Sequence, residues 1–467
     1  MLKRLAIISI AGILGFFVSQ AYANVVVVPC PNALVDSSGN ILAALHEARN
    51  GGTVQLQEGA YFLFNTVVVD FAFKGVLRGA GKDKTVITTD PDHPIDRVSL
   101  PLSTSYSEDD WLLFWFNIPV GAQGSVAMSD LSISVPYAEV TSADDKGLTS
   151  FVVVNGTKVD TSFDRMRIKG APGMNGWEFN NWLGISIFSL SGQDPMTGNH
   201  YLRNCEFDAA PISYGPDHIQ NGTLKATNNS LNNVFFGLIY EGLSNCTVEI
   251  SRNQFTNVKW NHAIGAISYS GLPDYPVAPQ PSRYVITYNS IQANGYADGI
   301  WIEDQFADDP SPEKKIKNPY VAFNSIGGES MGFGIVTWNV NRATIAANKL
   351  YGNGFVGVNL FGTTNTLVAG DSVEKFTPIP WVPTDWFPWL PLPPGEEITS
   401  AQIMLWADTS HCTVIGADLT DTVMDQGTDN TLINVDVKPF QWLGQASHDS
   451  MKGKLELRKQ HRPLWAR

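Results

Sequence analysis

The short stretch GIWIEDQ, residues 299–305, places an indole and two carboxylates together at the end of an apolar run. Most glycoside hydrolases use a pair of carboxylic acids to protonate a glycosidic bond and to activate water or attack the sugar. Aromatic rings suit the same ligands, because the face of a pyranose is apolar while its rim needs hydrogen bonds. Trp301, Glu303 and Asp304 are therefore candidate residues of a carbohydrate site. The structural alternative is that the two acids only solvate a turn.

A repeat of about two dozen residues organises the chain around this stretch. A polar residue followed two positions later by an apolar one recurs at steps of 24, 24, 36, 35, 24 and 23 residues, at Cys205, Asn229, Asn253, Asn289, Asn324, Asn348 and Asp371. Short strands at this period, with no helices between them, stack on their own copies as parallel sheets in a solenoid. We expect the Asn residues to hold tight turns, since Asn tolerates left-handed backbone and hydrogen-bonds neighbouring amides.

A second signature, a Gly that opens an apolar strand, runs in phase with the first. Reading four residues on from Gly237, Gly265, Gly299, Gly334 and Gly357 gives one column on the outer face, formed by Glu241, Tyr269, Glu303, Trp338 and Phe361. Rungs stack about 4.8 Å apart, so Glu241 and Glu303, two rungs apart, would lie roughly 9 to 10 Å apart at the backbone. This is the upper edge of the separation of about 6.5 to 9.5 Å that lets an inverting glycosidase fit a water beside the sugar.

These observations predict a polysaccharide groove along the outer column. We take its candidate catalytic residues to be Glu241, Glu303 and Asp304. Its candidate substrate-binding residues are Tyr240, Lys259, His262, Tyr269, Trp301 and Trp338. A column of polar and aromatic residues also arises on the solvated wall of any solenoid, and this remains the structural alternative.

The N-terminal region supports the same architecture. Ile41, Leu45 and Ala48 fall on one helical face, which Asn40 can cap, so we expect a short helix over the first rung. Residues 36–89, with GGTV followed by a Gly-x-Tyr-like pair and a Leu-x-Gly-x-Gly rung, resemble the opening of the pectin lyase superfamily. The resemblance implies an all-β, right-handed parallel β-helix. It does not imply one reaction, because the group includes lyases, hydrolases, epimerases and adhesins.

Two alternatives to a hydrolase stay open. A polysaccharide lyase or epimerase needs a base near an acidic sugar, which Lys259 or His262 could supply. Such an enzyme often uses Ca²⁺, the one cofactor that the sequence suggests, with oxygen ligands from Asp298, Asp304, Asp308 and Asp309. The third reading is a non-catalytic surface or adhesion protein that uses the β-helix as a rigid rod.

The ends of the chain indicate export. Residues 1–23 read as a signal peptide, with Lys3 and Arg4 before an apolar run and Ala21-Tyr22-Ala23 before the expected cut. Residues 24–440 then form one β-helix domain with loop insertions near 271–282, 305–318 and 371–400, and residues 441–467 form a C-terminal cap or tail. We expect a secreted, periplasmic or cell-surface protein without a transmembrane anchor.

The net charge narrows the classes of binding partner, and the number of cysteines indicates whether disulfides stabilise the fold. The net charge is −14, and it becomes −16 without residues 1–23, which contain two basic groups and no acidic one. Such an acidic chain is a poor ligand for nucleic acid, and a polysaccharide is the expected partner. Four cysteines are too few to staple a chain of this length, so we expect unpaired thiols.

Overall fold

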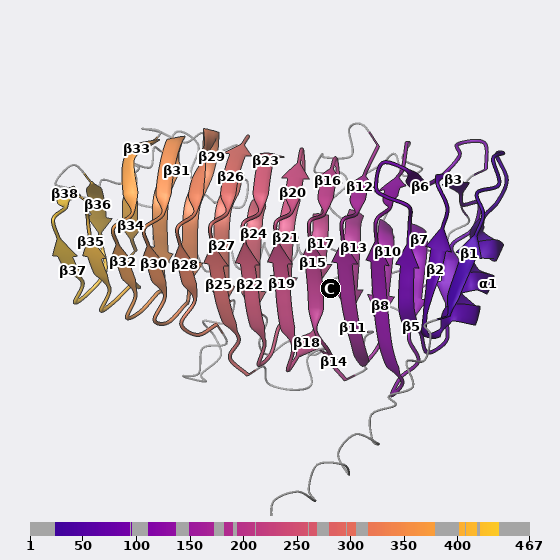
Figure 1. Cartoon of the computed structure of the whole chain (residues 1–467). Helices are drawn as coiled ribbons and strands as arrows, with labels where there is room; N and C mark the ends of the chain where they lie inside the picture. Colours follow the sequence, from indigo (N-terminus) through magenta and orange to yellow (C-terminus); the bar gives the residue numbers. More distant parts are fainter. Residues whose placement is uncertain are drawn as a thin grey trace, which may run out of the picture.

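The protein is a single row of stacked rungs, as the computed structural model shows (Figure 1). The residues described are 24–93, 95, 111–136, 149–171, 182–189, 194–210, 212–259, 261–268, 280–295, 297–304, 316–378, 401–406, 408–417 and 421–438. Every pairing between named strands is parallel, and each strand pairs with its equivalents in the neighbouring rungs. The predicted right-handed parallel β-helix is therefore confirmed, and with it the resemblance at the level of fold.

Each rung contributes strands to up to three faces, which we number in chain order within the rung. Face 1 is one continuous sheet. Its strands are β1 (Val25–Val28), β2 (Asn50–Leu56), β5 (Lys74–Arg78), β8 (Gln123–Ser129), β11 (Lys158–Asp164), β15 (His200–Arg203), β19 (Thr223–Thr227), β22 (Thr247–Ser251), β25 (Arg283–Thr287), β28 (Tyr320–Ala322), β30 (Thr344–Ala346), β32 (Leu367–Ala369), β35 (Thr413–Ile415) and β37 (Thr431–Ile433). Two short strands adjoin it, β14 (Met196–Thr197) and β18 (Ile219–Gln220).

Faces 2 and 3 join through the long strands β29 (Ser325–Trp338) and β31 (Lys349–Phe361). Face 2 contains the first parts of these two strands with β3 (Gly59–Phe62), β6 (Thr85–Thr88), β9 (Ser132–Ser134), β12 (Arg167–Lys169), β16 (Glu206–Asp208), β20 (Ser230–Asn232), β23 (Gln254–Lys259), β26 (Ser290–Asn294) and β33 (Ser372–Pro378). Face 3 contains their second parts with β4 (Val67–Val69), β7 (Trp111–Asn117), β10 (Thr149–Asn155), β13 (Trp182–Phe188), β17 (Ile212–Pro216), β21 (Phe236–Glu241), β24 (His262–Ser268), β27 (Asp298–Asp304), β34 (Ile403–Leu405), β36 (Thr422–Asp425) and β38 (Asp436–Lys438).

The helix α1 (Ser38–Ala48) lies at the N-terminal end of the row (Figure 1). Ile41, Ala44 and Leu45 are buried in the same core as the first strands, because they share one helical face. The expected cap at Asn40 is wrong. The helix begins at Ser38, whose backbone N–H donates to Asp36 Oδ1 over 2.9 Å.

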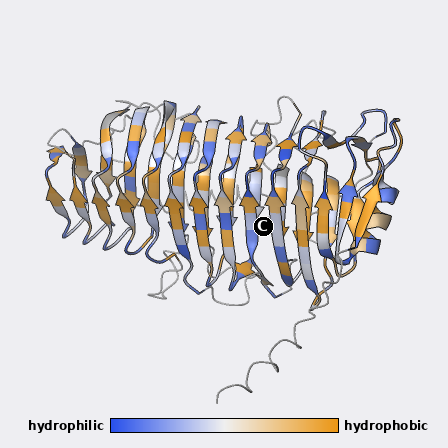
Figure 2. Ribbon diagram, viewed as in Figure 1, coloured by the Kyte–Doolittle hydropathy of each residue, from blue (hydrophilic) through white to orange (hydrophobic). Residues whose placement is uncertain are grey.

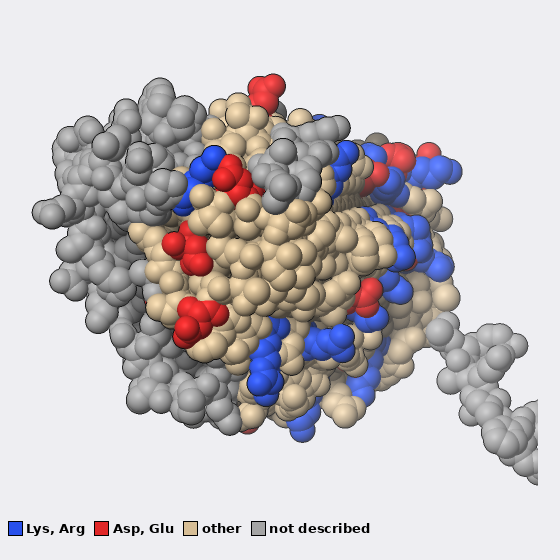
Figure 3. Space-filling view, turned by 90° about the vertical axis from the view of Figure 1, so that its left-hand side faces the viewer, with Lys and Arg blue, Asp and Glu red and all other residues tan. Residues whose placement is uncertain are grey.

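The core runs the length of the row and is built by alternation. Successive side chains of a strand point to opposite sides, so every second residue faces inward. Hydrophobic and hydrophilic residues accordingly alternate along many strands in Figure 2. At the end with β36 and β38 the described surface is mostly neutral, and Lys and Arg lie along the flanks (Figure 3).

A ladder of buried amides ties the rungs together at the corner between faces 1 and 2. Each ladder oxygen accepts the backbone N–H of the preceding member at 2.7 to 3.0 Å, from Cys205 through to Asp371. From Asn229 onward, each Nδ2 also donates to the next member's oxygen at 2.8 to 3.0 Å. The predicted hydrogen-bonding role of the Asn repeat is confirmed.

The left-handed residue of each turn, however, is the one before the ladder position. Positive φ angles of 50 to 60° occur at Asn204, Asn228, Arg252, Tyr288, Phe323 and Ala347, and not at the ladder residues. The ladder amides are therefore positioned by an ordinary backbone, and the preceding residue makes the turn.

Other features predicted from the sequence have mixed outcomes. All four cysteines are free, and Cys205, Cys246 and Cys412 are buried. No helix in the described ranges is long and apolar enough to cross a membrane. The expected insertions near 271–282, 305–318 and 371–400 fall largely outside the described residues, although β33 covers Ser372–Pro378. The expected signal peptide and the C-terminal tail 441–467 lie outside them entirely.

Removing one amide from the ladder should destabilise the protein. In Asn324→Ala the buried Asn289 N–H loses its acceptor at 3.0 Å, and Ile286 O loses its donor at 2.9 Å. We expect the free energy of unfolding in urea to fall by about 1 to 3 kcal/mol. The exposed Asn232→Ala is the control, with a change within about 0.5 kcal/mol. Equal unfolding midpoints for the two variants would contradict the structural role of the ladder.

The last ladder position predicts a dependence on pH. Burial raises the pKa of Asp371 to about 6 from 3.8, and its Oδ2 has no hydrogen-bond partner among the described residues. Because the folded pKa lies above the unfolded value, the stability that this carboxyl contributes is present below about pH 4 and is lost as the pH rises through about 6.

Asp371→Asn should therefore stabilise the protein at pH 7 to 8, on the order of 2 to 3 kcal/mol. The new amide can continue the ladder, in which each Asn Nδ2 also reaches a backbone carbonyl, as Asn348 reaches Val321 O at 3.0 Å. Urea denaturation of both proteins between pH 4 and 8 tests this. Parallel stability curves across that window would refute it.

Candidate functional site

The register of the strand pairings aligns one column of side chains along face 3. We call this the acid–aromatic column. It runs through Asp217, Glu241, Ile267, Glu303, Trp338 and Phe361, each paired with the next. The predicted alignment of Glu241, Glu303, Trp338 and Phe361 is thus confirmed. The expected place of Tyr269 belongs to Ile267, and Tyr269 itself lies outside the described residues.

The column points away from the core of the β-helix. On β27, Ile300 and Ile302 belong to the long core cluster, whereas Trp301 belongs to a separate apolar cluster with Phe333 and Met404. Glu303 has the same parity as Trp301 and so lies on the same side of the sheet. The acids are nevertheless buried, since Glu241 and Glu303 are each 2% exposed.

Trp301 holds the carboxylate of Glu303 in place. Its indole Nε1–H donates to Glu303 Oε2 over 2.7 Å. A buried carboxylate is stable only when hydrogen bonds or charges replace water, and an indole N–H is a donor with no acceptor capacity. The two residues, both selected from the sequence, therefore form one unit.

His262 supports this unit from the neighbouring rung. Its ring stacks on Trp301 with centroids 4.7 Å apart and planes 20° apart. His262 Nδ1 lies 2.8 Å from Asp298 Oδ2, and Asp298 Oδ1 accepts the Phe333 backbone N–H over 2.9 Å. This carboxylate–imidazole pair fixes the orientation of the ring, as in sites where His acts as an acid or base.

An aromatic stack continues the column beyond Glu303. Trp338 stacks on Phe361 with centroids 5.0 Å apart, and Phe361 stacks on Trp406 at 4.6 Å. Trp406 is anchored by its Nε1–H, which donates to Asn359 Oδ1 over 2.8 Å. Trp338 and Phe361 are only partly buried, in contrast to the acids beside them. They are the accessible part of the column.

The spacing of the carboxylates suits chemistry on a glycosidic bond in two ways. Asp217 and Glu241 lie on adjacent rungs, about 4.8 Å apart at the backbone, close to the separation of about 5 to 5.5 Å between the carboxyl groups of retaining glycosidases. Glu241 and Glu303 are separated by Ile267 and so lie about 10 Å apart at the backbone. Register alone thus allows either the retaining or the inverting spacing.

Three residues selected from the sequence lie elsewhere. Tyr240 faces inward and is fully buried; burial holds its pKa well above the usual value, and its ring contacts Tyr214 edge-on at 6.1 Å. Asp304 does not join the column, and its Oδ2 accepts the Ile316 backbone N–H over 3.2 Å. Lys259 ends β23 on face 2 and is half-buried. The substrate-binding assignment of Tyr240 is therefore wrong.

Two of the four carboxylates expected to bind Ca²⁺, Asp298 and Asp304, lie in the described residues, and both have protein partners. The described residues contain no group of three or more His, Cys, Asp or Glu side chains arranged to hold a metal ion. Asp298 is engaged by His262, and Asp304 by Ile316, while Asp308 and Asp309 lie outside the described ranges. The described residues therefore contain only part of the donor set expected from the sequence, and Ca²⁺ binding stays a prediction.

Sequence reasoning missed two members of this face. Asp217 occupies the rung whose register the repeat leaves open, and its Oδ2 lies 2.7 Å from His218 Nδ1. Trp406 follows the long insertion at 371–400, which hides its rung from the repeat. A signal for both existed in the short strands Ile212–Pro216 and Ile403–Leu405, which end at the residue immediately before Asp217 and Trp406, respectively.

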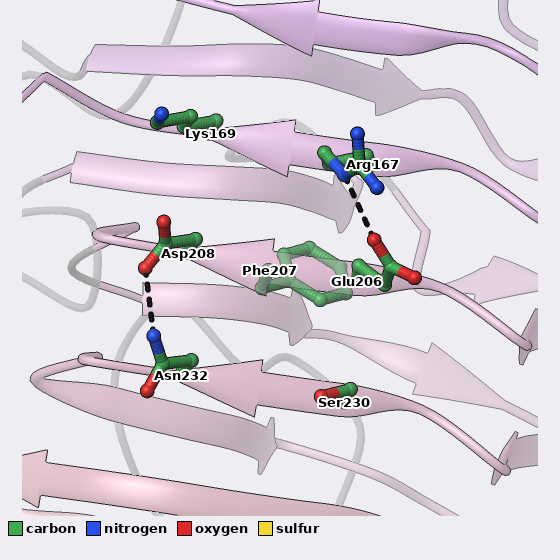
Figure 4. Close-up of a pocket in the computed structure, with 7 residues that line it drawn as sticks. All are labelled: Arg167, Lys169, Glu206, Phe207, Asp208, Ser230 and Asn232. Carbon is green, nitrogen blue, oxygen red and sulfur yellow. Dashed lines mark hydrogen bonds and ion pairs between the residues drawn. The ribbon is translucent and has the colours of Figure 1, made fainter. Parts of the chain in front are cut away.

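A separate hollow of about 350 Å³ lies on face 2, over β12, β16 and β20 (Figure 4). Three of its charged residues, Arg167, Glu206 and Asp208, have partners. Arg167 donates to Glu206 over 2.8 Å and to Asp83 over 2.7 Å, and Asp208 accepts from Asn232 over 3.0 Å. These contacts are those expected of a solvent-exposed face of the β-helix. The hollow is therefore a weaker candidate for a functional site than the acid–aromatic column.

Comparisons with known proteins do not assign the chain to a family. No family model matches the chain, and no curated protein matches its sequence. Among solved structures, the Dettilon tailspike protein gp208 is 11% identical over 87% of this chain and 68% of its own, with a TM-score of 0.49. PfbA, a surface adhesin of Streptococcus pneumoniae, is 13% identical over 82% of this chain and 90% of its own, with a TM-score of 0.44.

A periplasmic alginate epimerase is 12% identical over 84% of both chains, with a TM-score of 0.47. At these identities and TM-scores the likenesses carry no functional argument. The class to which the chain is assigned, the right-handed parallel β-helix proteins, follows from its own strand pairings.

The bond between Trp301 and Glu303 should be measurable as a coupling energy. Trp301→Phe keeps a ring against His262 but deletes the N–H, and Glu303→Ala deletes the acceptor. A double-mutant cycle by urea denaturation should give a coupling of about 1.5 to 3 kcal/mol, the usual range for a hydrogen bond to a charged group. Trp406→Phe with Glu303→Ala is the control pair, because that indole donates to Asn359. Equal coupling in both cycles would disprove the specific pairing.

Proposed function

We propose that this protein binds a polysaccharide along the acid–aromatic column and cleaves it with Glu303 as the acid or base. The observation that carries the proposal is the stack of Trp338, Phe361 and Trp406 beside an oriented buried carboxylate. Aromatic rings bind sugar faces, and a carboxylate beside them is positioned to transfer a proton to a glycosidic oxygen. Because the column continues along the axis of the β-helix, it can contact several sugars of one chain, which suits a polymer better than a small ligand.

Glu303 is the preferred catalytic group because its position in the column is the most tightly defined. It is paired with Trp338 in the strand register, so a sugar that contacts Trp338 lies next to the residue that carries the carboxylate. The hydrogen bond from Trp301 Nε1–H to Glu303 Oε2 fixes the orientation of the carboxyl group. Glu241, two rungs away, is the candidate second carboxylate, and Asp217 is its partner on the other side.

A lyase or epimerase is the second candidate, and the Asp298–His262 pair favours it. An imidazole held by a carboxylate through Nδ1 presents Nε2 as a base, which can remove the proton beside a sugar carboxylate. Lys259, at the end of β23 on face 2, precedes His262 by three residues across the turn into face 3, and is the candidate cation for the acidic sugar. A non-catalytic adhesin stays a third reading, in which the same column only binds.

The setting that we propose is extracellular, periplasmic or on the cell surface. Polysaccharide substrates lie there, and residues 1–23 have the pattern of an export signal. Mass determination of the exported protein, with Asn24 as its first residue, would support this. Retention of residues 1–23 in the mature protein would contradict it.

Substitutions in the column separate binding from catalysis. Trp338→Ala and Phe361→Ala should each weaken binding by about 1 to 3 kcal/mol, by analogy with the loss of other stacking aromatics. Glu303→Gln keeps the shape and should leave binding intact while abolishing turnover. Tyr351→Ala on face 2 is the control and should change neither.

The assay is a panel of a neutral β-glucan, a galactomannan and a polyuronate. Affinity electrophoresis measures binding, reducing ends measure hydrolysis, and ultraviolet absorbance of unsaturated sugars measures elimination. Reducing ends without absorbance support the hydrolase; absorbance that disappears in His262→Ala supports the lyase. Normal turnover by Glu303→Gln would remove Glu303 from the reaction, and normal binding by Trp338→Ala would remove the column from the site.

A further inference from the structure

Two large aromatic rings project from the corner between faces 1 and 2, where most turns carry smaller or polar residues. Tyr288 is 55% exposed and Phe323 is 46% exposed. Their rings stack with centroids 5.1 Å apart and planes 10° apart. On the other side of Tyr288, the guanidinium of Arg252 lies 5.8 Å from the ring centroid. We call these three residues the corner stack.

The backbone at these positions disfavours the residues that occupy it. Tyr288 has φ of 58° and Phe323 has φ of 59°, a left-handed conformation in which a bulky side chain is strained. The equivalent turns two and three rungs before Tyr288 carry Asn228 and Asn204, and Asn tolerates this conformation. Because the rings are also exposed, neither local conformation nor burial in the core accounts for them.

The turn that carries the rings is rigid. Asn289 and Asn324, the next residues in the chain, are both 1% exposed and belong to the amide ladder. Asn324 Nδ2 also donates to Ile286 O over 2.9 Å, and Asn289 Nδ2 to Ile250 O over 3.0 Å. A flat surface that is fixed before binding loses little conformational entropy when a ligand stacks on it.

We propose that the corner stack is a second glycan-binding surface, distinct from the acid–aromatic column on face 3. The next turn position after Phe323 is Ala347, whose methyl is too small to continue the stack, so that a sugar face can take the next place on the phenyl ring. Arg252 and the Tyr288 hydroxyl supply hydrogen bonds to the hydroxyl or carboxylate rim of the same chain.

This inference rests on the proposed function, because its ligand is the polysaccharide that the column engages. Two surfaces on one rigid rod hold a long chain more tightly than either alone, and a short oligosaccharide cannot reach both. The corner stack therefore increases retention on polymer and contributes no chemistry.

The test is the double variant Tyr288→Asn, Phe323→Asn, which introduces the residue type found at the equivalent turn positions Asn204 and Asn228. We expect its melting temperature to equal or exceed that of the parent, because the strain is relieved. Its dissociation constant for the retained polymer, from affinity electrophoresis against the β-glucan, galactomannan or polyuronate, should rise about tenfold. Turnover of a short oligosaccharide of the same polymer should not change.

The matched control is Tyr201→Asn, because Tyr201 also lies beneath an arginine, with Arg203 5.7 Å from its ring, but in an ordinary strand of face 1. It should bind polymer as the parent does. Parent-like affinity of the double variant would overturn the corner stack and leave the column untouched. Loss of polymer binding in the double variant but not in Trp338→Ala would instead sustain the corner stack and overturn the column. A parent protein that binds none of the polymers overturns both.

Discussion

The hydrogen-bonded stacking of one rung on the next is the constraint on which the other features of this protein depend. The amide ladder from Cys205 to Asp371 passes through the buried corner between faces 1 and 2, and each step fixes the height of one rung relative to its neighbour. Because strand side chains alternate with a period of two, that height decides which residues share a column. The same ladder thus positions Glu303 beside Trp338 on face 3 and Tyr288 beside Phe323 at the corner.

Polar side chains that are buried on face 3 need hydrogen-bond partners in place of water. Asp298, His262, Trp301 and Glu303 form one connected set, through a carboxylate–imidazole contact at 2.8 Å, a ring stack and an indole–carboxylate bond at 2.7 Å. Apolar clusters flank the set on both sides along the axis, one around Trp115 and one around Phe333. An arrangement of this kind costs stability unless every member is paired, which is why such sets gather where chemistry or binding requires them.

The repeat made the fold and much of the column predictable from sequence. The spacing of the Asn repeat predicted the ladder. The Gly residues that open the strands predicted that Glu241, Glu303 and Trp338 lie on the same side of the sheet. A Cβ at Gly299 or Gly334 would collide with the carbonyl of the next rung and with Ile326 or Leu350 of face 2, so these positions must be small. In the rung of β24 the small residue level with Gly299 is Ala263, not Gly265. Aligning on Gly265 therefore shifted that rung by two residues and put Tyr269 where Ile267 lies.

Other parts of the site could not be read from one sequence. The contact between His262 and Asp298 joins residues 36 positions apart across an insertion, and only the register of β24 and β27 brings them together. Tyr240 was assigned to the wrong side because neighbouring residues of a strand face opposite ways, and Glu241 next to it faces outward. Asp217 lies in a rung where Ile212–Pro216 lacks the opening Gly, which removed the marker on which the alignment relied.

The account's central claim is that the acid–aromatic column is where a glycan binds, and a crystal structure of the mature protein soaked with oligosaccharides tests it most directly. The fragments should come from whichever polymer the protein retains, with Glu303→Gln used to prevent turnover. The account predicts a sugar ring against Trp338 or Phe361, with a linkage oxygen within hydrogen-bonding distance of residue 303. Well-defined sugar density confined to other faces, with the column empty in a crystal where it is open to solvent, would contradict it.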